Sequence, residues 1–178
     1  MKIQLIYFLI LILMTGSLSS CDTGPKKPVL NDQQMKELQE PLMRVNRNLT
    51  EQDKMRIEKY IQRKGWKMNE TETGLYYEIL ETGQGDSIRT KELVSYKYVI
   101  YQLGGDTLYT DKKDGIRDFY VDQSNTEEGL NQAVQLMTRG TKARLILSPH
   151  LAFGLRGDDQ AVPARAILVY ELKLLENN

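Results

Sequence analysis

The chain has few side chains that could act as nucleophiles or metal ligands, because it contains one cysteine and one histidine. A structural zinc site uses about four cysteine or histidine ligands, and a disulfide joins a pair of cysteines. His150, which follows Pro149, is interpreted as a solvated turn residue rather than as a base. We therefore expect no metal site, no cofactor, no disulfide framework and no Ser/His/Asp triad.

The single cysteine follows a short apolar segment near the N-terminus. Lys2 precedes an uninterrupted apolar run over residues 5–14, which is shorter than the about 20 residues that span a bilayer. The sequence LSSC at residues 18–21 then resembles the bacterial lipobox. We predict a lipoprotein signal peptide over residues 1–20, lipidation of Cys21 and a lipid-anchored place in the bacterial cell envelope, facing the periplasm. The alternative is an ordinary signal peptide with a cysteine near its cleavage site.

Charge and composition narrow the function classes further. The 178 residues include 24 basic and 24 acidic side chains, and 40% of them are hydrophobic. A nucleic-acid-binding domain usually carries a basic face, so nucleic acid is not an expected partner. With the usual range of about 100–200 residues per domain, the chain is predicted to hold one compact domain and its appendages.

Two appendages are expected before this domain. Residues 21–30 contain Gly24, Pro25 and Pro28 with little apolar content, which predicts a tether. Residues 31–66 are predicted to form a helical arm. Two short apolar stripes fall well short of a coiled-coil seam, so we favour a spacer that packs on its own domain. The alternative is an arm that forms a homodimer or grips a client protein.

The arm is expected to consist of two helices. Asn31 and Asp32 are good N-cap residues, and Pro41 predicts a kink or a break. Thr50, followed by acidic residues, predicts the start of a second helix, and Gly65 predicts its end. The first helix carries apolar residues at helical spacing: Met35, Leu38, Leu42, Val45 and Leu49.

From residue 73 the pattern changes to strand-like runs rich in Val, Ile and Tyr. One helix is predicted over residues 127–138, where apolar residues share a face and Gly140 follows as a stop. Strands are predicted over residues 74–80, 93–103, 119–121, 142–148 and 166–175. One helix with such a sheet predicts an α+β domain over residues 73–178.

Three segments of this domain resemble motifs of the FKBP-type peptidyl-prolyl isomerases. They are LMTRGTKARLILSP at residues 136–149, LAFG at residues 151–154, which is similar to the family's YAYG loop, and VPARAILVYELKLL at residues 162–175. The lipobox, the helical arm and TETGLYY at residues 71–77 are also similar to FKBP-type lipoproteins associated with gliding motility in Bacteroidetes. The resemblance implies an FKBP-like antiparallel sheet half-wrapped around one helix.

The resemblance also implies a pocket for a proline-containing peptide. Tyr98 falls on the family's conserved tyrosine, and Tyr170 falls on the aromatic residue that closes the pocket. It assigns catalytic roles to Tyr98, Phe153 and Tyr170, and substrate-binding roles to Leu108, Tyr109, Phe119, Leu130 and Val162.

Several positions depart from the family's pattern. Leu108 and Tyr109 stand where the family has Phe-Asp, so a buried carboxylate is missing. Phe153 replaces the loop tyrosine and lacks its hydroxyl, and Leu130 replaces a tryptophan. A missing hydrogen bond weakens binding by about 0.5–1.5 kcal/mol, so weak isomerase activity is expected.

The function expected from these patterns is a peptidyl-prolyl cis-trans isomerase that assists the folding of exported proteins, with proline-containing polypeptides as clients. The reaction needs no nucleophile, because a dry apolar pocket favours the twisted amide over the planar one. Two alternatives stay open. One is a catalytically silent FKBP-fold binding or scaffold lipoprotein, including one in gliding motility, and the other is a homodimer whose arms form a chaperone cleft.

Overall fold

The structure, a computed structural model, describes residues 31–123 and 125–176. The chain falls into two units, residues 1–43 and 44–178, and the boundary lies inside helix α2 (Asp32–Lys64). The predicted signal peptide and the whole predicted tether, with Cys21, lie outside the described residues. No helix in the described ranges combines the length and the apolar character needed to cross a membrane.

Helix α2 is a single helix in which Pro41 is an interior residue, so the second helix start predicted at Thr50 is wrong. Proline removes one main-chain hydrogen bond, while the Glu, Leu, Met and Arg residues around it favour helix. The Thr50 hydroxyl donates to the Asn46 carbonyl at 2.9 Å, one turn back, instead of capping a new helix. The helix ends at Lys64, and Gly65 follows with φ +67°, as the predicted stop requires.

The sheet of the second unit is antiparallel and runs in the order β1-β2-β8-β9-β4-β5, with β6 also paired to β4. Its strands are β1 (Asn69–Glu70), β2 (Tyr76–Glu81), β4 (Leu93–Gln102), β5 (Thr107–Thr110), β6 (Arg117–Tyr120), β8 (Lys142–Leu147) and β9 (Leu168–Leu174). A small second sheet pairs β3 (Gln84–Ser87) with β7 (Thr138–Arg139). The helical elements that follow α2 are α3 (Asp111–Asp114), α4 (Glu128–Gln135) and the 3₁₀ helix η1 (Pro149–Leu151).

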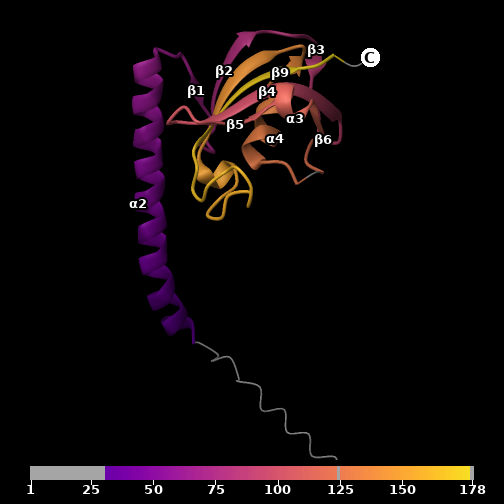
Figure 1. The fold of residues 1–178 in the computed structure, drawn as a ribbon. Coiled ribbons are helices and arrows are strands. Elements are labelled where there is room, and N and C mark those ends of the chain that lie inside the picture. The colour runs from indigo at the N-terminus through magenta and orange to yellow at the C-terminus, as the bar shows by residue number, and fades with distance from the viewer. Residues whose placement is uncertain (1–30, 124, 177–178) are drawn as a thin grey trace, which may run out of the picture. The chain divides into compact units, whose positions relative to one another are not determined.

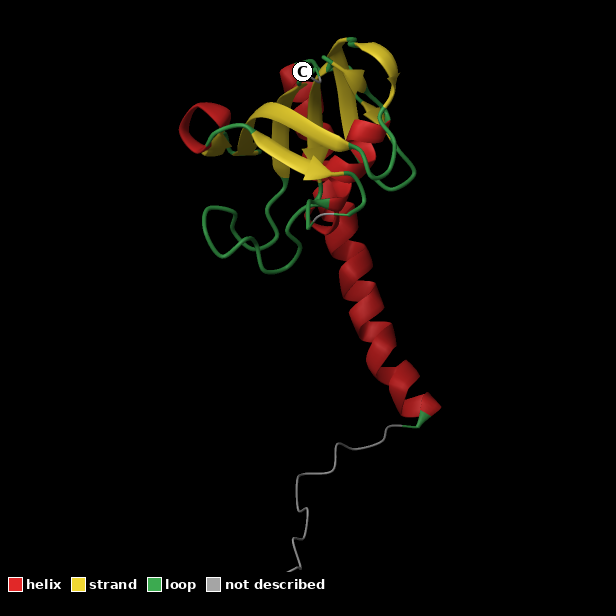
Figure 2. Cartoon of the chain, turned by 90° about the vertical axis from the view of Figure 1, so that its right-hand side faces the viewer, coloured by secondary structure: helices red, strands yellow, loops and turns green. Residues whose placement is uncertain are grey.

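Both faces of this sheet are covered, and the period-two alternation of the strands explains how. Along β9, Leu168, Tyr170 and Leu172 join the core that packs on α4, while Val169 joins a second cluster with residues of α2. Figures 1 and 2 show the sheet curved around the short helix α4. The predicted α+β arrangement, an antiparallel sheet half-wrapped around one helix, is confirmed.

The second cluster joins the C-terminal half of α2 to the outer face of the sheet. Ile57 and Tyr60 of α2 are buried in it, at 1% and 3% exposure. Trp66 packs edge-on against Tyr60, with ring centroids 5.4 Å apart, and the Arg144 guanidinium lies 3.9 Å from the Trp66 ring centroid. This half of the arm therefore packs on its own domain, in the manner of the spacer that the sequence favours.

Helix α4 is shorter than predicted. It ends at Gln135 rather than at residue 138, and Thr138 already belongs to β7. Leu136 leaves the helix and is exposed, while Met137 stays in the core. Gly129 explains why the helix packs so closely, since a Cβ there would lie 1.7 Å from the Leu147 side chain.

Candidate functional site

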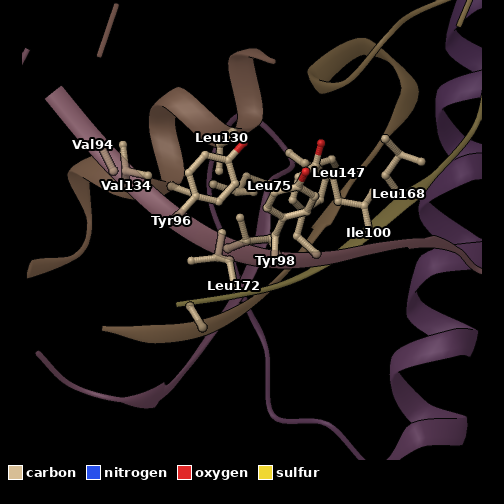
Figure 3. Close-up of a cluster of buried hydrophobic side chains, with 14 of the residues drawn as sticks. Leu75, Val94, Tyr96, Tyr98, Ile100, Leu130, Val134, Leu147, Leu168 and Leu172 are labelled. Atoms are coloured by element: carbon tan, nitrogen blue, oxygen red, sulfur yellow. The ribbon is translucent and has the colours of Figure 1, made fainter. Parts of the chain in front are cut away.

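The candidate site is built on strand β4, whose alternation places two tyrosines on the face that α4 covers. Tyr96 and Tyr98 are 3% and 2% exposed, with ring centroids 5.4 Å apart. Figure 3 shows both rings rising from β4 toward the same side, among Leu130 and other core side chains. Phe119 of β6 packs edge-on against Tyr96 at 5.9 Å. A buried aromatic cluster thus lies between the sheet and α4.

All eight residues that the resemblance assigns to the pocket lie in or against this one core. Five of them are buried in the core: Tyr98, Phe119, Leu130, Val162 and Tyr170. The other three are half-buried and pack against it: Leu108, Tyr109 and Phe153. The structure therefore brings the predicted residues together, although they come from six different segments of the chain. Their catalytic and substrate-binding roles stay predictions.

A cavity of about 340 Å³ opens beside this cluster. Only Phe119 and Phe153 of the predicted set line it, because Tyr98 and Tyr170 lie deeper in the core. The full lining is Tyr96, Ile116, Arg117, Asp118, Phe119, Asn125, Thr126, Glu127 and Phe153. A proline ring or a small apolar side chain fits within this volume.

Sequence reasoning missed three of the lining residues that matter most. Tyr96 precedes Tyr98 by two residues and shares its face, so the alternation along β4 could have identified it. The same argument applies to Arg117, which stands two residues before Phe119 in β6. Glu127 is the N-cap residue of α4, at the start of the helix predicted over residues 127–138, and no signal marked its side chain as part of the pocket.

Arg117 brings a cation into the aromatic cluster. Its guanidinium carbon lies 4.7 Å from the ring centroid of Tyr98 and 4.7 Å from that of Tyr109. The side chain is half-buried and forms no ion pair within the described part of the chain. A guanidinium between two phenol rings is held by cation–π attraction, worth about 0.5–2 kcal/mol per ring.

Glu127 brings a carboxylate into the lining of the cavity. The Tyr170 hydroxyl donates to Glu127 Oε1 at 2.5 Å. Burial and this carboxylate raise the pKa of Tyr170 well above its ordinary value of 10.0. Burial, and then Glu127, raise the pKa of Tyr96 as well. Both phenols are therefore neutral at physiological pH, so they serve as rings and donors rather than as bases.

The loop that follows Phe153 is anchored to β5 by a hydrogen bond. The Tyr109 hydroxyl donates to the Asp158 carboxylate, which also accepts from the main-chain N–H groups of Gln160 at 2.9 Å and Val162 at 2.8 Å. Burial acts to raise the pKa of Asp158, but these hydrogen bonds outweigh it and hold the pKa below its ordinary value of 3.8. Tyr109, which replaces the family's aspartate, is thus paired with a carboxylate from the loop.

His150 lies apart from this cavity. Its Nε2 is 3.2 Å from the Thr73 carbonyl oxygen and its Nδ1 is 3.0 Å from Ser148 Oγ. Because a carbonyl can only accept, Nε2 carries the proton and Nδ1 accepts from the serine. Over residues 31–123 and 125–176, no three His, Cys, Asp or Glu side chains gather closely enough to bind a metal ion. The candidate site is therefore an apolar pocket with a few polar groups.

Comparison with known proteins gives the same fold and family. The family "FKBP-type peptidyl-prolyl cis-trans isomerase" matches residues 85–175. A probable FKBP-type peptidyl-prolyl cis-trans isomerase of Haemophilus influenzae is 28% identical over 116 residues, which are 65% of this chain and 47% of that protein. FkpA of Escherichia coli, an FKBP-type peptidyl-prolyl cis-trans isomerase, is 28% identical over 122 residues, or 67% of this chain and 43% of FkpA.

Two solved structures show the likeness of the fold. The crystal structure of Escherichia coli FkpA superposes with a TM-score of 0.62 at 22% identity, covering 99% of this chain and 81% of that one. The N-terminal domain of FKBP42 from Arabidopsis thaliana gives a TM-score of 0.57 at 18% identity, covering 61% of this chain and 90% of that domain. The chain spans about half the length of the curated relatives it matches. With the family matched over more than half of its length, the chain belongs to the FKBP-type peptidyl-prolyl cis-trans isomerases.

Proposed function

We propose that the chain is a weakly active peptidyl-prolyl cis-trans isomerase that assists the folding of exported proteins in the bacterial envelope. The observation that carries this proposal is the aromatic cavity beside Tyr96, Phe119 and Phe153, in a chain of the FKBP-type family. Envelope location is supported by the likeness to FkpA and by the lipobox-like sequence at residues 18–21. Its substrates would be polypeptides whose refolding is slowed by the cis-trans isomerisation of a proline.

The chemistry follows from the pocket's composition. Rotation about the X–Pro bond has a barrier of about 18–20 kcal/mol, because the planar amide is stabilised by resonance. The twisted amide has lost that resonance and is less polar, so it tolerates an environment without water better than the planar form does. Apolar walls from Phe119 and Phe153 exclude water, and the neutral phenol of Tyr96 adds a donor without adding charge.

Two features support a low rather than a high rate. Phe153 offers no hydroxyl to a bound peptide, and each such hydrogen bond contributes about 0.5–1.5 kcal/mol. Arg117 and Glu127 place charges in the cavity lining, where the twisted amide gains most from an apolar environment. These charges also favour the second candidate, a catalytically silent FKBP-fold module that binds clients or scaffolds other envelope proteins, including gliding-motility components.

Membrane attachment through Cys21 is part of the same proposal. A lipid chain contributes about 0.8 kcal/mol per buried CH₂, so a triacylated cysteine would anchor the chain firmly. Metabolic labelling with a fatty acid should mark the protein in its host, and Cys21→Ser should abolish the label. Labelling that persists in Cys21→Ser would refute the anchor without affecting the pocket.

A homodimer formed by the arm is a further element of the proposal. Leu42, Met43 and Val45 of α2 are 64%, 60% and 54% exposed, and contiguous exposed apolar side chains are the kind of surface that a second chain covers. Sedimentation of the purified chain tests it. A mass of one chain across the concentration range would contradict the homodimer and leave the arm a spacer.

The decisive experiment is a refolding assay limited by proline isomerisation, with a tetrapeptide isomerisation assay beside it. The full chain should accelerate both reactions above the spontaneous rate, and Phe153→Ala should lose most of this acceleration. Leu155→Ala is the matched control, because Leu155 stands two residues further along the same loop, is 68% exposed and does not line the cavity. If the folded chain accelerates neither reaction, the isomerase proposal is wrong and the catalytically silent binding module is the function that is left.

A further inference from the structure

Arg117 is the polar group of the cavity whose role the proposed reaction does not explain. It stands on β6 opposite Tyr96, and its guanidinium lies between the rings of Tyr98 and Tyr109. A guanidinium carries five N–H donors, and the neighbouring phenol oxygens of Tyr96 and Tyr98 engage only part of them. Arg117 lines the cavity and forms no ion pair with the described residues, so the N–H groups that do not interact with Tyr96 and Tyr98 are available to a ligand.

Tyr98 supplies an independent observation that points to the same need. Its side chain is 2% exposed, and its hydroxyl finds no hydrogen-bond partner among the described residues. A buried hydroxyl without a partner is costly, and such groups are rare in folded proteins. Next to it stands Arg117, which is a donor and cannot supply an acceptor lone pair. The Tyr98 oxygen can accept from Arg117, so what lacks an acceptor among the described residues is the Tyr98 proton and the remaining N–H groups of Arg117. Of these two side chains only Arg117 lines the cavity, so it is Arg117 that can reach an acceptor on a ligand.

The carboxylate nearest in the lining is not that acceptor. Glu127 receives the Tyr170 hydroxyl at 2.5 Å, and it forms no ion pair with Arg117 within residues 31–123 and 125–176. Asp118 is exposed at the rim of the cavity. The acceptor is therefore expected from the substrate, and the acceptors that every peptide carries are its carbonyl oxygens.

We propose that Arg117 is a substrate-positioning residue that donates a hydrogen bond to a backbone carbonyl of the bound peptide. The inference rests on the proposed isomerase function and deepens it. Phe153 lines the same cavity and has no hydroxyl to offer. Arg117 thus supplies the donor that this position lacks.

The chemistry of the reaction decides which carbonyl is contacted. The oxygen of the isomerising amide is most negative in the planar ground state and loses charge as the bond twists. A cation at that oxygen would stabilise the ground state and slow the reaction. Arg117 therefore contacts the carbonyl of a neighbouring peptide bond, where the interaction is equal in the ground state and the transition state. Such uniform binding lowers KM and leaves kcat unchanged.

The test compares three variants of the full chain in the tetrapeptide assay. Arg117→Met keeps the length of the side chain and removes its donors, and Arg117→Lys keeps a charged donor. Arg156→Met is the matched control, since Arg156 is exposed and does not line the cavity. We expect KM to rise at least about tenfold in Arg117→Met at unchanged kcat, because a hydrogen bond from a charged group contributes about 1.5–3 kcal/mol, and about 1.4 kcal/mol is a factor of ten. Arg117→Lys should recover part of this loss.

A second arm separates positioning from a structural role. Adding Phe153→Tyr to Arg117→Met restores a donor to the cavity from another side, and KM should fall again. A drop in kcat at unchanged KM, or no change in either constant, would overturn the proposal.

If the wild-type chain proves inactive, the proposed function fails, and the binding constant of a proline peptide measured by titration replaces KM. Binding about tenfold weaker in Arg117→Met then supports the inference, and equal binding refutes it.

Discussion

The ion pair between Asp53 and Arg165 should be the interaction that fastens the arm helix to the loop beside the pocket. Arg165 Nη2 lies 2.6 Å from Asp53 Oδ2, and the two side chains are 32% and 9% exposed. The Arg165 main-chain N–H also donates to the Gly154 carbonyl at 3.0 Å, at the start of the loop that follows Phe153. Arg56, which is 62% exposed, lies 3.6 Å from the other carboxylate oxygen of Asp53. The perturbation we choose is Asp53→Asn, which keeps the shape and removes the charge.

The size of the effect follows from burial. Exposed ion pairs contribute about 0–1 kcal/mol, whereas removal of one partner from a fully buried pair costs about 3–5 kcal/mol. Here the charge left behind belongs to Arg165, which is one-third exposed and can regain water. We therefore expect Asp53→Asn to lower the free energy of unfolding by about 2 kcal/mol. With a urea dependence of about 2 kcal/mol per M, the unfolding midpoint falls by about 1 M.

The assay is urea unfolding followed by the fluorescence of Trp66. This is the only tryptophan of the chain, and it packs on Tyr60 in the layer between α2 and the sheet. A double-mutant cycle with Arg165→Gln isolates the energy of the pair. Residue 165 has a left-handed backbone (φ +56°), and arginine and glutamine both have to adopt it, so the substitution leaves that backbone cost unchanged. Arg56→Gln is the control and should change stability by less than about 0.5 kcal/mol. A coupling energy below about 0.5 kcal/mol between Asp53 and Arg165 would refute the reasoning.

Three further predictions concern single contacts. Because the pKa of Asp158 is lower in the folded chain, the ionised carboxylate stabilises the fold fully above its unfolded pKa of about 3.8, and this stabilisation is lost as pH falls through the folded pKa. Between pH 5 and pH 2 the wild type should therefore lose more unfolding free energy than Asp158→Asn. Parallel stability curves for the two proteins would contradict this. Gly83→Ala should destabilise by more than about 3 kcal/mol in thermal or urea unfolding, because its Cβ would lie 1.9 Å from a backbone oxygen, whereas Gly104→Ala, with 3.7 Å to its nearest neighbour, should cost less than about 1 kcal/mol. Tyr170→Phe removes the hydrogen bond to Glu127 and should lower the free energy of unfolding, measured with urea, by about 1.5–3 kcal/mol. An unchanged urea midpoint would show that water replaces the tyrosine hydroxyl as the hydrogen-bond partner of Glu127 at no cost.

The sequence predicted most of this fold because its periodic signals are strong. The alternation of Val94, Tyr96, Tyr98 and Ile100 placed β4 correctly, and all four are buried. The sequence-based prediction failed where a local signal competes with tertiary packing. Thr50 has the residue type of an N-cap, but its position one turn after Asn46 lets its hydroxyl serve an ongoing helix instead. Capping preference is worth about 1 kcal/mol, which packing of Ile57 and Tyr60 on the sheet exceeds.

The pocket was predicted less completely than the fold. Family resemblance located the aromatic core through Tyr98 and Tyr170, but it could not locate side chains that the family does not share. Arg117 and Glu127 come from β6 and from the start of α4, and their charges enter the cavity only because the fold brings these segments beside Tyr96. Alternation along β6 places Arg117 on the face of Phe119, but spacing within one strand does not show that this face meets the start of α4.

The departures from the family's pattern become intelligible once the contacts are considered together. Replacement of the aspartate by Tyr109 removes a carboxylate from β5, and Asp158 supplies one from the loop to the Tyr109 hydroxyl. Replacement of the loop tyrosine by Phe153 removes a donor, and Arg117 places another in the same cavity. In these two cases the lost polar group is matched by a complementary group from a neighbouring segment. A pocket that had merely decayed would show losses without such partners, so the pattern supports the proposal that this cavity binds a peptide.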